Sequence, residues 1–279
     1  MASSAPSPPA EADPSAASRL DLRGRRALVT GGHRGIGGAV VLGLAAAGVH
    51  VAVIDRGGTA ARTSDIPSRV RGYGVEFYAT AADLADVDAT VAAVKRVQDE
   101  FGAIDILVNN AGITELQPLV RTPAHPGPPL TVAAWDAQFA VNVRAPMVVA
   151  TAVAPHMITA RRGKIINMSS QAGTAALHLH AAYGASKAAL DHLTRSMAAE
   201  WGAYNIQANA VAPTVIASDM GDAAWPPGAD RTKAMLARIP ASRFGQAWEV
   251  ADLVVFLAGG GSDLISGQVL GVDGGYTAV

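Results

Sequence analysis

Short apolar runs alternate with helix-like segments along most of the chain. Runs with the length and composition of β-strands lie at residues 26–30, 51–54, 76–79, 104–108, 164–168, 206–211 and 268–272. Segments with apolar positions at helical spacing follow the first strand up to residue 47 and recur at 86–101, 131–159, 181–201 and 248–257. Strands that are apolar on both faces are typical of a parallel sheet covered by helices. The alternation predicts an α/β fold, a single-domain, Rossmann-like, doubly wound parallel sheet of about seven strands with helices on both faces.

The part of the chain in which strand and helix patterns alternate is predicted to form one domain. Residues 19–279 contain neither a linker nor an internal repeat, so we expect a single domain there. Residues 1–18 are rich in Ala, Ser and Pro and lack the apolar stretch of a secretory signal. We interpret them as a disordered tail.

Composition narrows the classes of partner. The formal net charge is -1, whereas a nucleic-acid-binding protein usually carries a concentrated basic face. The absence of cysteine excludes disulfides, thiolate catalysis and Cys-ligated zinc, and it suits a cytoplasmic location. The most apolar stretch, residues 39–54, is short for a membrane helix and is interrupted by Gly43, Gly48 and His50. We expect a small-molecule substrate and neither a nucleic acid nor a membrane as partner.

Two irregular stretches interrupt the alternation. Residues 120–130, called the proline loop below, contain too many prolines for a regular helix. Residues 214–240 contain Trp225 with two prolines directly after it, followed by a short helical pattern. Long ordered loops in a compact domain are often functional. For the proline loop two interpretations stay open, a rim that narrows substrate choice and a surface insertion.

A glycine-rich turn follows the first strand. Gly31, Gly35 and Gly37, with Arg34 and Ile36 between them, form the pattern G-x-x-x-G-x-G ahead of the first helix. Glycines let the backbone approach a pyrophosphate closely, and the start of a helix offers free N–H groups to the anion. The structural alternative is a tight packing turn. The position between a strand and a helix favours dinucleotide binding.

The second strand ends in an acidic residue. A carboxylate at this place can accept hydrogen bonds from the adenosine ribose of NAD. It also repels the 2′-phosphate of NADP, by about 3 kcal/mol for two unit charges about 5 Å apart at an effective dielectric near 20. Arg34 and Arg56 flank Asp55 and can pair with that phosphate. Asp55 favours NAD as the cofactor, with NADP as the alternative.

Three polar residues form a candidate acid–base site. Tyr183 and Lys187 are four residues apart on a predicted helix and share one face of it. A neighbouring ammonium favours the phenolate and lowers the pKa of a tyrosine, which makes the pair a plausible proton-transfer device. Ser170 follows the fifth strand, where ligands bind in sheets of this kind. Each signal also has a structural alternative when it is considered alone. Tyr and Lys four residues apart occur by chance on many helices, and a serine in the place of Ser170 is also typical of a helix cap.

Together these motifs resemble those of the short-chain dehydrogenase/reductase family. The resemblance rests on the glycine turn, on Asn109-Asn-Ala-Gly112 after the fourth strand, and on Asn142, Ser170, Tyr183 and Lys187. It covers about residues 22–276. It implies a catalytic tetrad in which Tyr183 is the general acid/base and Ser170 orients the substrate oxygen. Lys187 would bind the nicotinamide ribose and lower the tyrosine pKa, and Asn142 would hold a proton-relaying water.

The resemblance also implies the remaining cofactor contacts. Residues expected at the adenine, along the cofactor and at the nicotinamide end are Asp83, Leu84, Asn110, Ala111, Gly112, Pro213, Ile216 and Ser218. Thr214 stands where the family usually has glycine, and Ser218 where it usually has threonine. We expect both departures to change how the nicotinamide is positioned without preventing its binding. The family further implies a homotetramer.

Loop motifs resemble one subgroup of this family, that of L-xylulose reductase and D-threitol-type polyol dehydrogenases. The matching residues include Gln171, His180 and Trp225. Gln171 and His180 offer hydrogen bonds to a polyol and Trp225 an apolar wall, so we expect all three to bind substrate beside Ser170 and Tyr183. The structural alternative for Trp225 is a role in the core of the loop, and the alternative for His180 is a surface or lid histidine. No metal is expected, because no third histidine or carboxylate lies near His178 and His180 in the sequence.

The sequence therefore predicts an oxidoreductase that moves a hydride between a nicotinamide cofactor and a secondary alcohol or ketone. A small polyol and its ketose form the favoured substrate pair. The alternatives are an NADPH-dependent carbonyl reductase of ketones or dicarbonyls, a reductase of bulky ketones, and a nucleotide-sensing protein without catalysis.

Overall fold

The computed structural model describes residues 21–57, 64–217 and 225–279. Within these ranges, seven parallel strands form one sheet in the order β3-β2-β1-β4-β5-β6-β7. The strands are β1 (Arg26–Thr30), β2 (His50–Asp55), β3 (Phe77–Ala81), β4 (Ile106–Asn109), β5 (Gly163–Met168), β6 (Ile206–Pro213) and β7 (Val269–Val272). This confirms the predicted doubly wound fold and its strands to within a few residues. The expected tail, residues 1–18, lies outside the described residues.

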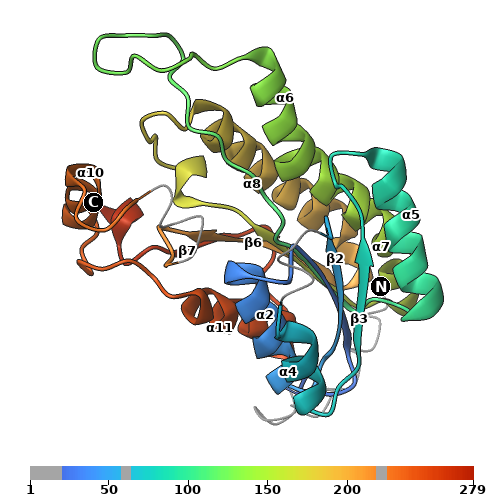
Figure 1. Cartoon of the computed structure of the whole chain (residues 1–279). Coiled ribbons are helices and arrows are strands. Elements are labelled where there is room, and N and C mark those ends of the chain that lie inside the picture. Colours follow the sequence, from blue (N-terminus) through green and yellow to red (C-terminus); the bar gives the residue numbers. More distant parts are fainter. Residues whose placement is uncertain (1–20, 58–63, 218–224) are drawn as a thin grey trace, which may run out of the picture.

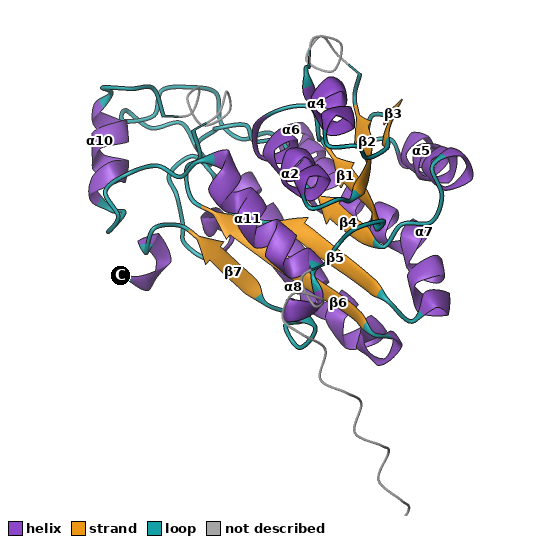
Figure 2. Cartoon of the chain, turned by 90° about the horizontal axis from the view of Figure 1, so that it is seen from below, coloured by secondary structure: helices purple, strands orange, loops and turns teal. Residues whose placement is uncertain are grey.

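Helices cover both faces of the sheet (Figures 1 and 2). One face carries α2 (Gly35–Ala46), α4 (Ile66–Gly72) and α11 (Ala247–Ala258). The other carries α5 (Val87–Glu100), α7 (Ala145–Ala160) and α8 (Ala181–Trp201). Two further helices, α6 (Val132–Phe139) and α10 (Asp230–Ala237), lie towards the carboxyl ends of the strands. Helix α4 was not predicted, because seven residues with only two buried side chains carry too little periodicity.

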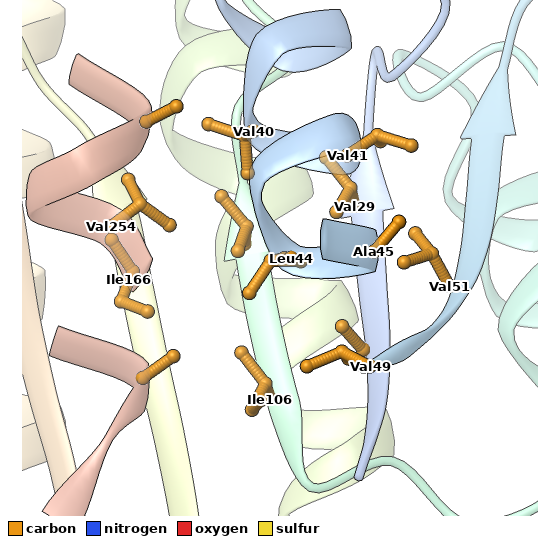
Figure 3. Packing of buried hydrophobic residues seen from close by; sticks show 14 of the residues in the cluster. Val29, Val40, Val41, Leu44, Ala45, Val49, Val51, Ile106, Ile166 and Val254 are labelled. Carbon is orange, nitrogen blue, oxygen red and sulfur yellow. The ribbon is translucent and has the colours of Figure 1, made fainter. Parts of the chain in front are cut away.

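The core on the α2 face joins the two halves of the sheet. Leu44 of α2 is fully buried in the same cluster as Val29 of β1, Ile166 of β5 and Val254 of α11 (Figure 3). Because residues from both sides of β1 and β4 meet in this cluster, burial of their apolar surface fixes the orientation of α2 against the sheet. The start of α2 is thereby held at the carboxyl end of β1.

The long helix predicted at residues 131–159 is interrupted. A π-helical turn, Ala140–Arg144, separates α6 from α7. Such turns are rare inside helices and are often found at functional sites. Taken together, Val132–Ala160 is long and apolar enough to cross a membrane by length and composition. However, 56% of its apolar window is buried, and α7 supplies Val149, Val153 and Met157 to the core, so the packing of this domain accounts for its apolar side chains.

Candidate active site

A cavity of about 680 Å³ opens at the carboxyl ends of the strands. It lies across β1 and β4, where the strand order reverses, which is where open α/β sheets bind their ligands. The predicted site residues that line it are Gly31, Arg34, Gly35, Ile36, Gly37, Asp55, Arg56, Asp83, Leu84, Asn110, Ala111, Gly112, Ser170, Gln171, His180, Tyr183, Lys187, Pro213, Ile216 and Trp225. Asn142 is not among the lining residues, and Ser218 lies outside the described residues.

The glycine turn forms a cradle that only glycine can form. A Cβ atom on Gly37 would overlap the carbonyl oxygen of Gly31 and the side-chain amide of Asn110. Asn110 locks this arrangement, because its Nδ2 donates to the Thr30 and Gly31 carbonyls at 3.0 Å each. In the described residues no side chain caps the start of α2. Its amide end faces the cavity and fits a pyrophosphate.

Asp55 lines the cavity at the end of β2. Its Oδ2 is 3.3 Å from Nδ1 of His33, and its Oδ1 accepts a hydrogen bond from the Arg56 amide at 2.8 Å. The hydrogen bond from His33 is the main cause that lowers the pKa of Asp55, and burial opposes it. The carboxylate is therefore ionised at neutral pH. Sequence reasoning missed His33, although β1 and β2 are neighbours and the turn after β1 must lie beside the end of β2.

Tyr183 and Lys187 project from α8 into the cavity, as predicted. Nζ of Lys187 lies 5.6 Å from the centre of the Tyr183 ring and donates to the Met168 carbonyl at 2.7 Å. Ser170, directly after β5, accepts from the Ala172 amide at 3.2 Å. Its hydroxyl also lowers the pKa of Tyr183 through a hydrogen bond. The three side chains thus meet where an alcohol or carbonyl oxygen can be held.

Burial dominates the titration of the two catalytic side chains. It is the largest effect on Tyr183 and raises its pKa, and the hydrogen bond with Ser170 opposes it. Burial also lowers the pKa of Lys187 to about 8, against a weaker opposite effect of the Asp191 charge. The expected lowering of the Tyr183 pKa by the Lys187 ammonium stays a prediction. Tyr183 is protonated at neutral pH, the state in which it donates a proton to a ketone oxygen.

Asn142 lies behind the cavity lining and holds the loop that follows β4. It is fully buried in the π-helical turn, where its Oδ1 accepts from the Ile113 amide and its Nδ2 donates to the Ile113 carbonyl, both at 2.9 Å. Nδ2 also lies 3.0 Å from the Ser186 hydroxyl. A Cβ atom on Gly112 would meet both Asn142 Oδ1 and Lys187 Nζ, so the amide and the amine flank one glycine. Asn142 positions the loop after β4, and its role in a water relay stays a prediction.

The end of the cavity away from Asp55 is polar on one side and apolar on the other. Gln171 is buried, and its Oε1 has no hydrogen-bond partner among the described residues. Nδ1 of His180 lies 2.7 Å from the His178 carbonyl, so it carries the proton and leaves Nε2 as an acceptor. Burial lowers the pKa of His180 and keeps the ring neutral at pH 7. Both side chains line the cavity and carry an acceptor for a hydroxyl proton, the Gln171 Oε1 and the His180 Nε2.

Trp225 provides the apolar side. Its ring is nearly parallel to that of His180, with centres 6.5 Å apart, and it packs on a small cluster around Ile239 and Tyr276. Trp225 is therefore both cavity wall and loop core. Thr114, which sequence reasoning missed, also lines the cavity, and its Oγ1 has no partner in the described residues. A threonine two positions after a glycine gives no sequence signal of this role.

In residues 21–57, 64–217 and 225–279 no group of three or more His, Asp or Glu side chains is placed to hold a metal ion. His125 and His178 lie 6.2 Å apart between ring centres, without a third ligand in the described part of the chain.

Comparison with known proteins agrees with this geometry. A family model described as enoyl-(acyl carrier protein) reductase matches residues 31–277. L-xylulose reductase from Bos taurus is 42% identical over 261 residues, 93% of this chain and 99% of the relative. D-threitol dehydrogenase from Mycolicibacterium smegmatis is 37% identical over 93% of this chain and 94% of the relative. The chain belongs to the short-chain dehydrogenase/reductase family.

Solved structures give the same assignment. A gluconate 5-dehydrogenase from Burkholderia cenocepacia, in complex with NADP and tartrate, is 39% identical and superposes with a TM-score of 0.85. The match covers 95% of this chain and 100% of that one. As a short-chain dehydrogenase/reductase, the chain is an oxidoreductase that acts on CH–OH groups with a nicotinamide cofactor. The cradle, the cavity and the placement of Tyr183 and Lys187 fit that cofactor.

The proline loop of this short-chain dehydrogenase/reductase does not line the cavity. It projects beyond α6 (Figure 1), and its base is closed by a hydrogen bond from the Leu130 amide to the Pro118 carbonyl at 2.8 Å. His125 packs on His178, and Gln117 at the loop base donates to the Leu179 carbonyl at 3.1 Å. The expectation of a direct rim is therefore wrong. The loop instead braces the segment that carries His180.

Replacing Lys187 by Met should move the pH dependence of alcohol oxidation to higher pH. Without the ammonium, the Tyr183 pKa rises further, and the rising limb of kcat/KM shifts upward by about 1 pH unit. The pH profile of kcat/KM in the oxidation direction measures this, with Lys95→Met on the exposed face of α5 as the matched control. An unchanged profile for Lys187→Met would contradict the electrostatic role of the lysine.

Deleting residues 123–129 should disturb substrate binding and leave the cofactor end intact. Because the loop braces the His180 segment, a small displacement of that ring should raise the substrate KM on the order of tenfold. Steady-state kinetics and a cofactor titration measure the two effects. Equal substrate preference before and after deletion would show that the loop is a surface insertion without influence on the site.

Proposed function

We propose that this enzyme interconverts a small polyol and the corresponding ketose, with NAD as the preferred cofactor and NADP as a second one. The observation that carries the substrate proposal is Gln171, a buried residue of the cavity lining whose Oε1 has no hydrogen-bond partner in the described residues. A buried acceptor without a partner costs free energy, and a substrate hydroxyl would satisfy it. His180 Nε2 offers a second acceptor beside the Trp225 wall.

The relatives support a polyhydroxylated substrate. L-xylulose reductase, D-threitol dehydrogenase and the D-erythrulose reductase of Gallus gallus are all named for small sugars or sugar alcohols. Gluconate 5-dehydrogenase is named for a sugar acid. A substrate with several hydroxyls matches the acceptors at Gln171 and His180 better than a bulky apolar ketone does.

Each side chain around the reacting oxygen has its own role in the proposed reaction. In the reductive direction the Tyr183 hydroxyl donates its proton to the carbonyl oxygen, which the Ser170 hydroxyl orients. When bound, the nicotinamide would supply a hydride to the carbonyl carbon or accept one from the carbinol carbon. In the oxidative direction Tyr183 takes the hydroxyl proton back, and the Lys187 ammonium favours the resulting phenolate. Lys187 would also hold the nicotinamide ribose from its position beside Gly112.

The cofactor preference follows from the charges at the ribose. Asp55 is ionised and lines the cavity, which favours the free 2′-hydroxyl of NAD over a phosphate. Arg34 and Arg56 line the same end and allow NADP to bind as well. NADP-bound neighbours, among them the gluconate 5-dehydrogenase, support NADP as the alternative, in an enzyme that works mainly as a carbonyl reductase.

We also propose that the enzyme is a homotetramer. In the described residues β7 is an edge strand that pairs with β6 alone. Trp248 and Phe256 are exposed on the neighbouring helix α11, with 60% and 39% of their surface accessible. An open strand edge beside exposed aromatic side chains is a typical self-association surface.

Gln171→Leu should separate polyols from simple ketones. The variant loses the acceptor for a substrate hydroxyl, so kcat/KM for four- to six-carbon polyols and ketoses should fall about tenfold or more. Activity on a monofunctional cyclic ketone should fall by less than a factor of about three, because that substrate does not use the acceptor. A panel of both substrate types, each run with NAD(H) and NADP(H), measures the difference.

Tyr183→Phe is the catalytic control in the same panel, since it should abolish turnover of both types. An equal loss for polyols and simple ketones in Gln171→Leu would contradict the polyol assignment. Higher kcat/KM with NADP than with NAD in the wild type would contradict the cofactor preference.

Light scattering of the purified protein should give four times the chain mass of 28.4 kDa. Trp248→Glu places a charge in the proposed contact and should shift the mass towards a smaller assembly. A monomeric wild type at micromolar concentration would rule out the tetramer.

A further inference from the structure

His33 is the third residue of the turn between β1 and α2, yet its side chain is directed into the protein. Only 6% of the side-chain surface is exposed. The ring meets Phe77 of β3 edge-on, with ring centres 6.3 Å apart. Its own carbonyl accepts from the Ser64 hydroxyl at 3.0 Å, just before α4 begins. The histidine is therefore held by two separate segments, and a mere turn residue needs neither of these contacts.

The polar atom of this buried ring meets Asp55. Nδ1 lies 3.3 Å from Oδ2, while Oδ1 accepts from the Arg56 amide at 2.8 Å. The backbone amide of His33 also contributes a hydrogen bond to this carboxylate. The imidazole is thus a side-chain donor beside backbone donors, and together they fix the plane of the carboxylate better than the backbone donors do alone.

We infer that His33 is a specificity-determining residue, which selects between NAD and NADP by fixing the Asp55 carboxylate towards the cofactor ribose. This inference rests on the proposed role of Asp55 at the cofactor ribose and on the position of Asp55 in the cavity. His33 itself does not line the cavity and acts through Asp55.

The charges around the pair explain why fixing the carboxylate matters. Arg34 and Arg56 line the same end of the cavity, and the Arg71 guanidinium lies 5.9 Å from the Phe77 ring on which His33 packs. A carboxylate released from His33 can turn towards these cations, so its position at the ribose is no longer fixed. The ribose of NAD then loses a fixed acceptor, while the 2′-phosphate of NADP meets less repulsion.

His33→Leu and His33→Asn test this together. Leucine keeps an apolar contact with Phe77 and removes the donor, whereas asparagine keeps an N–H near the position of Nδ1. Direct titration of NAD and of NADP gives both dissociation constants without any substrate. We expect His33→Leu to weaken NAD binding about tenfold and NADP binding by less than about threefold. His33→Asn should retain most of the wild-type preference for one cofactor over the other.

A remote histidine–carboxylate pair serves as the matched control. His50, at the opposite end of β2, accepts from the Glu76 amide and lies 3.9 Å from the Glu76 carboxylate. His50→Leu should leave the ratio of the two dissociation constants unchanged.

A double-mutant cycle with Asp55→Asn decides whether His33 acts through Asp55. In the Asp55→Asn background, His33→Leu should no longer change the ratio of dissociation constants. The same shift in both backgrounds, or equal weakening of NAD and NADP by His33→Leu, would overturn the inference. A wild type that binds NADP more tightly refutes only the proposed preference, because the effect of His33 is read as a change in the ratio.

Discussion

The site depends on the close approach of three backbone segments between β1 and β4. Gly37 lies so near the Gly31 carbonyl and the Asn110 amide that no side chain larger than hydrogen fits. Asn110 and Thr30 join the turn after β1 to the loop after β4 through four hydrogen bonds of 3.0 Å. The cradle for the cofactor and the loop that leads to the catalytic half are therefore a single unit. The core around Leu44 keeps α2 in register with that unit.

Burial affects the pKa values of Tyr183 and Lys187 more than neighbouring charges do. Burial raises the pKa of Tyr183 and lowers that of Lys187, so each group is pushed towards its neutral form. In the free protein this leaves a protonated phenol beside an amine that is still mostly charged at pH 7. The arrangement serves reduction directly, whereas oxidation needs the additional positive charge that an oxidised nicotinamide brings. The direction of catalysis thus depends on which form of the cofactor enters the cavity.

The polar side chains proposed to recognise substrate and cofactor are both fixed from outside the cavity. His180 is oriented by the His178 carbonyl and by a segment that the proline loop braces. Asp55 is oriented by His33, which also does not line the cavity. In both cases the residue that meets the ligand keeps its geometry only because a second residue holds it. Family relatives that share the contacting residues can therefore differ in preference.

The sequence by itself determined the architecture and most of the cavity-lining residues, because strand length, the glycine pattern and the Tyr-x-x-x-Lys spacing are local properties of the chain. The π-helical turn at Asn142 and the contacts of His33, Thr114 and the proline loop were decided only in the tertiary structure. They arise from segments that are distant in sequence and meet at one edge of the sheet. The sign of the Tyr183 pKa shift belongs to this second group. A charge four residues away is visible in the sequence, whereas the desolvation that outweighs it depends on everything that packs around the phenol.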